Sequence, residues 1–139
     1  MSKVAVVFWS GTGNTEAMAN AVAEGIQAAG AEAAVVGMDF SADAVAGYDA
    51  IAFGCPAMGA EVLEEAEFQP LWDDVKGALS GKKIALFGSY GWGDGEWMRN
   101  WEDDAKAAGA ELACESVTAN EAPDDDAVAA CRNLGKALA

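Results

Sequence analysis

The residues best suited to chemistry form a short polar stretch near the start of the chain, "WSGTGNT" at positions 9–15. Hydroxyl and amide side chains alternate there with glycines, and the stretch directly follows an apolar run. A strand that ends in a glycine-rich turn and leads into a helix offers an anion unpaired backbone N–H groups and the positive end of the helix dipole. The stretch therefore predicts a phosphate site. Its candidate residues are Ser10, Thr12, Gly13, Asn14 and Thr15.

Two better-known phosphate motifs do not match this stretch. The dinucleotide fingerprint requires glycine or alanine where this chain has Glu16, and the P-loop requires a lysine followed by serine or threonine, which is missing. Because the stretch contains no cation, it suits a terminal phosphate that is held rather than transferred. Serine, threonine and asparagine are also ordinary turn and cap residues, so the stretch alone leaves a purely structural role open.

Two further loops present side chains that could hold a flat ring. "PAMGAE" contains Met58, whose polarizable sulfur suits the face of an aromatic system, and Glu61, which could accept a hydrogen bond from a ring N–H. "SYGWGDG" presents Tyr90 and Trp92 on a glycine-rich backbone that can approach a ligand closely. Taken singly, Met58 and Trp92 could equally be core residues. Together with the phosphate stretch, the loops predict a planar, conjugated ligand with a phosphate tail, and flavin mononucleotide (FMN) meets both requirements.

The elements that must position these loops can be read from the apolar pattern. Short apolar runs bounded by glycine, serine or aspartate predict five strands, at 3–8, 33–37, 49–54, 83–88 and 111–117. Residues with helical spacing predict helices at 15–29, about 68–79, 95–108 and 124–138, with a shorter one near 41–47. Strands alternating with helices predict a single three-layer α/β/α sandwich around a parallel sheet. Ligands of such sheets bind beyond the carboxyl ends of the strands, where all three loops are expected.

The composition excludes several classes of function. A chain of 139 residues fits a single domain over 1–139. Neither a membrane-spanning apolar run nor a signal-peptide pattern occurs, so we expect a cytoplasmic protein, with a monomer as the default. The net charge of -15 argues against nucleic acid and anionic membranes as partners and favours a protein with a basic surface.

The chain also lacks the usual machinery of hydrolases. Histidine is absent, and the 3 cysteines show no Cys-x-x-Cys spacing. Ser-His-Asp and Cys-His pairs, histidine bases and imidazole metal ligands are therefore excluded, and no zinc site is indicated. We expect no catalytic residues and no metal.

The three loops together resemble those of the short-chain bacterial flavodoxins. The motifs "WSGTGNTEAMA", "GCPAMG" and "LFGSYGWGDGEWM" occur in the family's order, and the resemblance spans the whole chain. It implies a five-stranded parallel sheet in the order 2-1-3-4-5, one noncovalently bound FMN, and electron transfer between redox proteins without turnover of a substrate. It also implies contacts to the ring and to its edge, with Asn120 as a further polar contact. The ring residues are Pro56, Ala57, Met58, Gly59, Glu61, Ser89, Tyr90, Gly91 and Trp92.

The resemblance further implies how the flavin would cycle. Flavodoxins stabilise the semiquinone, and the carbonyl of Gly59 could accept a hydrogen bond from the reduced ring. The stretch "EVLEEAEFQPLWDD" (61–74) holds six acids and no base, so a second electron beside it would be unfavourable. We therefore expect a low-potential carrier that cycles mainly between semiquinone and hydroquinone and docks on basic surfaces of reductases or dehydrogenases. Pro56 and Ala60 depart from the family pattern. Some relatives carry a serine in place of Pro56, which adds a hydrogen bond to the phosphate, and relatives often carry Asp, Asn, Ser or Gly in place of Ala60.

Other classes remain as alternatives. An FMN-dependent quinone reductase shares the fold but needs a substrate pocket and usually longer loops. A signalling receiver domain needs an aspartate at the end of the third strand, where this chain has Gly54 and Cys55. A binding module without a redox role is the third alternative.

Overall fold

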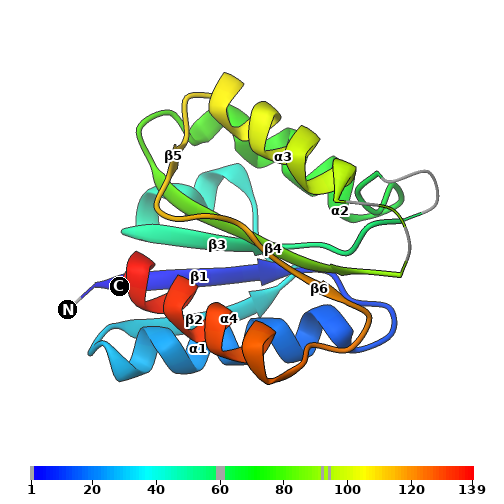
Figure 1. Ribbon diagram of the computed structural model, residues 1–139. Coiled ribbons are helices and arrows are strands. Elements are labelled where there is room, and N and C mark those ends of the chain that lie inside the picture. The colour runs from blue at the N-terminus through cyan, green and yellow to red at the C-terminus, as the bar shows by residue number, and fades with distance from the viewer. Residues whose placement is uncertain (1, 59–61, 92, 94) are drawn as a thin grey trace.

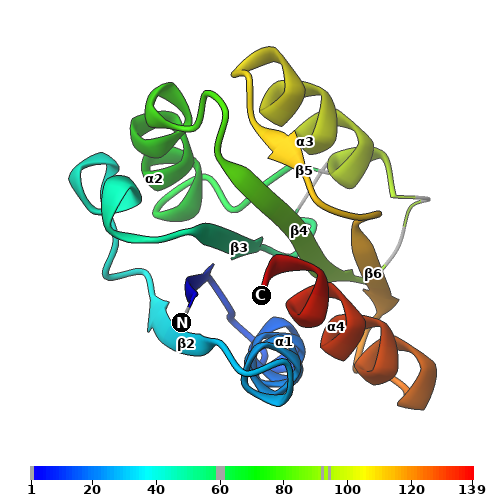
Figure 2. The same ribbon diagram turned by 90° about the vertical axis from the view of Figure 1, so that its left-hand side faces the viewer.

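The computed structural model describes residues 2–58, 62–91, 93 and 95–139. A parallel sheet runs through this part of the chain in the order β2-β1-β3-β4, and β5 and β6 both pair with β4 (Figures 1 and 2). This order confirms the predicted one and the predicted α/β fold class. The strands are β1 Lys3–Phe8, β2 Glu32–Gly37, β3 Ala50–Gly54, β4 Lys83–Tyr90, β5 Glu111–Leu112 and β6 Val117–Asn120.

The central strands are buried because helices cover both faces of the sheet. Residues 4–7 of β1 and the whole of β3 are buried. Their continuous apolar sequences follow from this position, since a strand between two helical layers has no solvent face for polar side chains.

The helices form one layer on each face of the sheet. They are α1 Asn14–Ala28, α2 Phe68–Val75, α3 Glu96–Ala107 and α4 Asp125–Leu138, with 3-10 helices at Ala42–Gly47 and Lys76–Ala78. α2 and α3 pack on one face, and α1 and α4 pack on the other (Figure 1). Within the described ranges, no helix combines the length and the apolar character that a membrane crossing requires.

Two glycines bring α1 and α4 into backbone contact. A Cβ atom on Gly135 would overlap the carbonyl oxygen of Val22, and one on Gly25 would overlap the carbonyl oxygen of Arg132. Each glycine therefore leaves the space that the other helix occupies. This contact fixes α1, whose first turn begins beside the end of β1.

The predicted extent of the last strand, 111–117, is wrong. The structure divides this segment into β5 and β6, because residues 113–116 lie opposite only residues 85–86 of β4. The two residues in excess are more than a one-residue bulge accommodates, so the chain leaves the sheet after β5 and rejoins it at β6. The last strand, β6, consequently extends beyond the predicted end to Asn120, which lies beside Tyr90 of β4.

Candidate functional site

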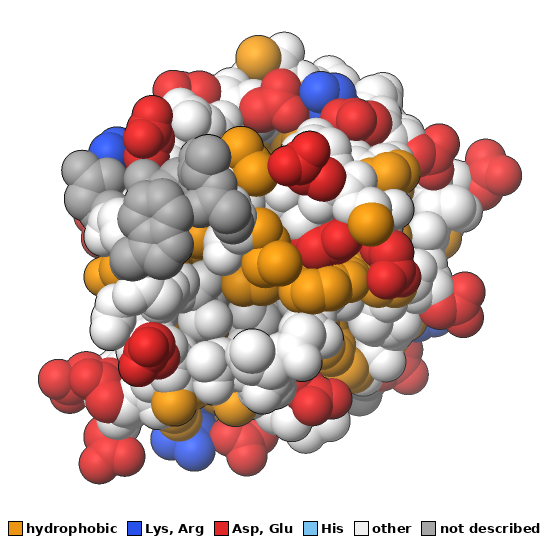
Figure 3. Space-filling model, turned by 90° about the vertical axis from the view of Figure 1, so that its right-hand side faces the viewer, with side chains coloured by type: hydrophobic (Ala, Val, Ile, Leu, Met, Phe, Trp, Pro, Cys, Tyr) orange, Lys and Arg blue, Asp and Glu red, His pale blue; other side chains and the backbone are white. Residues whose placement is uncertain are grey.

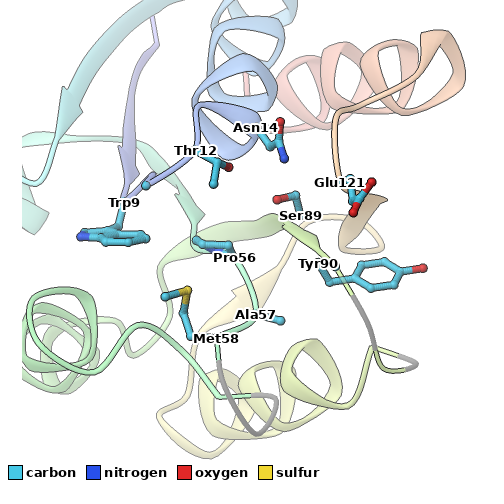
Figure 4. A pocket seen from close by; sticks show the side chains of 11 residues that line it. Trp9, Thr12, Asn14, Pro56, Ala57, Met58, Ser89, Tyr90 and Glu121 are labelled. Atoms are coloured by element: carbon cyan, nitrogen blue, oxygen red, sulfur yellow. The ribbon is translucent and has the colours of Figure 1, made fainter.

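A pocket of about 260 Å³ opens at the carboxyl end of the sheet, where the loops after β1, β3 and β4 meet (Figures 3 and 4). Figure 3 looks onto this end and shows hydrophobic side chains in the middle with carboxylates around them. The three loops that the sequence singles out thus face one cavity, as expected for loops that follow parallel strands. The described lining residues are Trp9, Gly11, Thr12, Asn14, Pro56, Ala57, Met58, Ser89, Tyr90, Gly91 and Glu121.

The first turn of α1, which begins at Asn14, borders the pocket, and we call this side of the pocket its head. Gly13 precedes the helix with a φ of 92°, a left-handed conformation that glycine adopts without steric cost. Ser10 Oγ accepts hydrogen bonds from the N–H groups of Gly13 at 3.1 Å and Glu16 at 3.3 Å. The N–H groups of Asn14 and Thr15 are too close to the helix start to find an acceptor within the helix. Together with the helix dipole they form a site for an anion.

The hydroxyl of Thr15 fits a bound phosphate. Thr15 is 1% exposed, and its Oγ1 atom has no hydrogen-bond partner within the described chain. A buried hydroxyl that lacks a partner costs about 1–3 kcal/mol, and a phosphate oxygen would remove this cost. Ser10 can contribute as well, because its Oγ only accepts in the two bonds above and its own hydrogen is free to donate.

Aromatic side chains form the ends of the pocket. Trp9 and Tyr90 lie at opposite ends, with Pro56 and Met58 between them (Figure 4). A Cβ atom on Gly11 would lie 2.9 Å from the Trp9 ring, so a larger residue at position 11 would require the indole to shift. The backbone N–H of Trp9 donates to the carbonyl of Gly54 at 3.0 Å, which ties this loop to the end of β3. The arrangement suits a flat ring that leads to the anion site at α1.

The loop after β3 is held from both sides. The N–H of Ala57 donates to the carbonyl of Ser89 at 3.0 Å. Met58 and Val62 exchange two backbone hydrogen bonds of 2.8 and 3.1 Å in an antiparallel bridge. The Met58 side chain is 38% exposed and lines the pocket, so its sulfur is available to an aromatic ring. The predicted contacts Gly59 and Glu61 and the divergent Ala60 lie outside the described residues.

The pocket carries negative charge without a positive counterpart. Among its described lining residues, Glu121 has a carboxylate and none is lysine or arginine. The backbone of Glu121 is left-handed, with a φ of 58°, and its N–H donates to the carbonyl of Tyr90 at 2.7 Å. The pocket therefore suits a neutral ring better than an anionic one.

The structure brings most of the predicted site residues together. Ser10, Gly13 and Thr15 do not line the cavity but form the turn at its head. Asn120 lines a separate hollow beside α4. Trp92, like Gly59 and Glu61, lies outside the described residues. The predicted residues that line the pocket are Thr12, Asn14, Pro56, Ala57, Met58, Ser89, Tyr90 and Gly91.

Trp9, Gly11 and Glu121 line the pocket although they are not among the predicted residues. Trp9 and Gly11 belong to the polar stretch at 9–15, and their position in that motif was the available signal. Glu121 directly follows Asn120. β6 ends at Asn120, and the left-handed backbone of Glu121 turns the chain there, a conformation that the sequence of a non-glycine residue does not indicate.

Comparisons with known proteins identify the family of the chain. The family model for flavodoxin matches residues 6–135. The chain is 47% identical to the flavodoxin of Megasphaera elsdenii over 137 residues, which cover 98% of each chain. It is 43% identical to the flavodoxin of Clostridium beijerinckii over 135 residues, 96% of this chain and 97% of the relative. The solution structure of the two-electron reduced Megasphaera elsdenii flavodoxin superposes with a TM-score of 0.90 at 46% identity, covering 97% of both chains.

The family match includes the strand ends that form the pocket, and FMN is the cofactor of this family. The Thr15 hydroxyl, which has no partner within the described residues, and the N–H groups of Asn14 and Thr15 at the start of α1 fit its phosphate. The chain therefore belongs to the flavodoxins, a family of FMN-binding electron carriers.

Proposed function

We propose that this protein is a low-potential one-electron carrier that shuttles electrons between redox proteins and turns over no substrate of its own. It binds one FMN noncovalently, in a single domain over 1–139. Bound FMN supplies the electron chemistry, mainly between its one-electron-reduced and two-electron-reduced forms.

The charge of the pocket carries this proposal. None of the described lining residues is cationic, and Glu121 is anionic. A negative charge that develops on the ring would find no counter-charge among these residues, and the rings of Trp9 and Tyr90 at the ends of the pocket would limit its contact with water. Both effects oppose the second electron and lower the potential at which it is accepted. The acidic stretch 61–74 acts in the same direction.

Each part of the ligand has its own set of residues in this proposal. The phosphate is held by Ser10, Thr12, Gly13, Asn14 and Thr15. The ring is lined by Trp9, Pro56, Ala57, Met58, Ser89, Tyr90 and Gly91, with Glu121 at its edge. Gly59, Glu61, Trp92 and Asn120 complete the proposed set on the strength of the family motifs. The carbonyl of Gly59 would accept a hydrogen bond from the reduced ring, a contact that only one redox state makes.

The partners are redox proteins, reductases or dehydrogenases, with basic docking surfaces. The net charge of -15 supports this, because opposite charges steer two proteins together and like charges keep wrong partners away. The same charge disfavours nucleic acid and anionic membranes. We propose that the protein acts as a monomer in the cytoplasm.

An anaerobic dithionite titration of the purified protein, followed by absorption, tests the proposal. We expect a yellow protein that passes through a long-wavelength blue form and then bleaches, with two separate midpoints of which the second is lower. Reduction in one two-electron step, together with turnover of an added quinone, would contradict the carrier function and favour a reductase. A colourless protein that binds no added FMN would contradict the cofactor assignment.

A further inference from the structure

The loop that carries Met58 continues to α2, and a buried carboxylate, that of Glu64, lies at this junction. Glu64 is 7% exposed, and its side chain accepts hydrogen bonds from three backbone N–H groups at the start of this helix. Oε2 accepts from Ala66 at 2.9 Å, and Oε1 accepts from Glu67 at 2.7 Å and Phe68 at 2.8 Å. Hydrogen bonds to a charged acceptor are stronger than neutral ones, so this junction is firmly held.

The backbone of the same residue reaches the other end of the loop. The N–H of Glu64 donates to Sγ of Cys55 at 3.3 Å. Cys55 is itself fixed, because its N–H donates to the carbonyl of Phe87 at 3.1 Å and its carbonyl accepts from Trp97 Nε1 at 3.2 Å. Glu64 thus joins the end of β3 to the start of α2. Between the two ends lie Pro56, Ala57 and Met58, which line the pocket.

The ionisation of both groups suits this role. Burial raises the pKa of Glu64, but the backbone hydrogen bonds from Phe68, Glu67 and Ala66 outweigh it, and the pKa lies below its ordinary value. The side chain is therefore a carboxylate at neutral pH. Burial raises the pKa of the Cys55 thiol to about 12, so the sulfur beside Glu64 stays neutral.

We propose that Glu64 is a positioning residue for the flavin pocket: by joining Cys55 to α2, it sets the place of Ala57 and Met58 against the ring. The inference rests on the proposed function only in taking FMN as the ligand. A helix cap with no effect on the pocket is the competing explanation, because three N–H groups at a helix start need an acceptor in any case.

The test compares Glu64→Gln with Glu65→Gln. Glutamine at position 64 keeps an oxygen for two N–H groups but turns an NH₂ group toward the third. Glu65 is the next acid along the chain and is exposed, so its variant removes the same charge without removing any of the hydrogen bonds that Glu64 makes. The dissociation constant of FMN is measured by quenching of flavin fluorescence. Backbone amide shifts of Ala57 and Met58 are recorded in the FMN-loaded, ¹⁵N-labelled proteins, and apoprotein melting temperatures are measured alongside.

We expect Glu64→Gln to weaken FMN binding about tenfold, the equivalent of one charge-assisted hydrogen bond. The amide signals of Ala57 and Met58 should move, and Glu64→Asp should recover part of the affinity because it restores the charged acceptor. Glu65→Gln should change the affinity less than about twofold. If Glu64→Gln does not fold, Cys55→Ala removes the other half of the junction and is judged by the same measurements.

A lower melting temperature of the Glu64→Gln apoprotein with unchanged FMN affinity and unchanged amide signals would overturn the inference and leave Glu64 as a helix cap only. Equal loss of affinity in the Glu64→Gln and Glu65→Gln proteins would also overturn it, because charge rather than position would then explain the effect. Failure of the unsubstituted protein to bind FMN would instead overturn the proposed function.

Discussion

Thr15 is buried, and its hydroxyl has no partner within the described residues. A substitution of this residue should therefore change FMN affinity and protein stability in different directions. Replacing Thr15 by valine removes the hydroxyl at nearly constant size. The apoprotein should keep its melting temperature or gain a little, because an unsatisfied buried group is lost. FMN affinity should fall about tenfold, since one hydrogen bond to the charged phosphate disappears. Fluorescence titration and thermal unfolding measure the two effects, and Thr118→Val, at an exposed position of β6, should change neither. Unchanged affinity would remove Thr15 from the phosphate site.

The same residue shows what can be predicted at this scale. The hydroxyl and amide residues at 10–15 were predicted because their types and spacing fit an anion whatever their exact orientation. Asn120 and Glu121 were harder to assign, because which of two neighbours faces the pocket depends on where β6 ends. Trp9 needed the structure as well, since its place at one end of the cavity depends on how the loop after β1 folds over the sheet.

At the scale of elements, the contact between α1 and α4 depends on glycine. In Gly135→Ala the new methyl group would overlap the carbonyl oxygen of Val22 and lie 2.9 Å from the N atom of Ile26. We expect a loss of about 1–3 kcal/mol in the free energy of unfolding, despite the better helix propensity of alanine. Gly77→Ala is the matched control, because a Cβ atom there meets nothing within 4 Å and φ is not positive. That variant should be neutral or slightly more stable. Urea unfolding compares the two, and equal stability of both would contradict close packing of the helices.

The elements differ in how far the sequence predicts them. Strands β1, β3 and β4 were predicted because burial on both faces leaves a continuous apolar run in the sequence. The division of the last strand into β5 and β6 was not predicted. It depends on how many residues of β4 lie opposite residues 111–117, and the sequence of 111–117 does not contain that information. That number is a property of the pairing between two distant segments.

At the scale of the whole molecule, net charge is the dominant feature. The chain carries 23 acids against 8 bases, and the resulting self-repulsion opposes the compact state. Raising the ionic strength from about 0.01 M to 0.3 M shortens the screening length severalfold and should raise the melting temperature of the apoprotein. Sodium and potassium chloride should act alike, because ionic strength rather than ion identity causes the effect. A melting temperature that does not rise with salt would contradict repulsion as a destabilising force.

Local pattern in the sequence determined the α/β class, the order of elements, the polar stretch that follows β1 and the excess of acids, since each is set by neighbouring residues or by composition. Tertiary structure decided which side chains meet at the pocket, where the last strand breaks, and that Glu64 joins Cys55 to α2. These features depend on register and close packing between segments far apart in the chain. A change of one residue in register, or of one methyl group at a helix contact, would alter them while leaving the local pattern nearly the same.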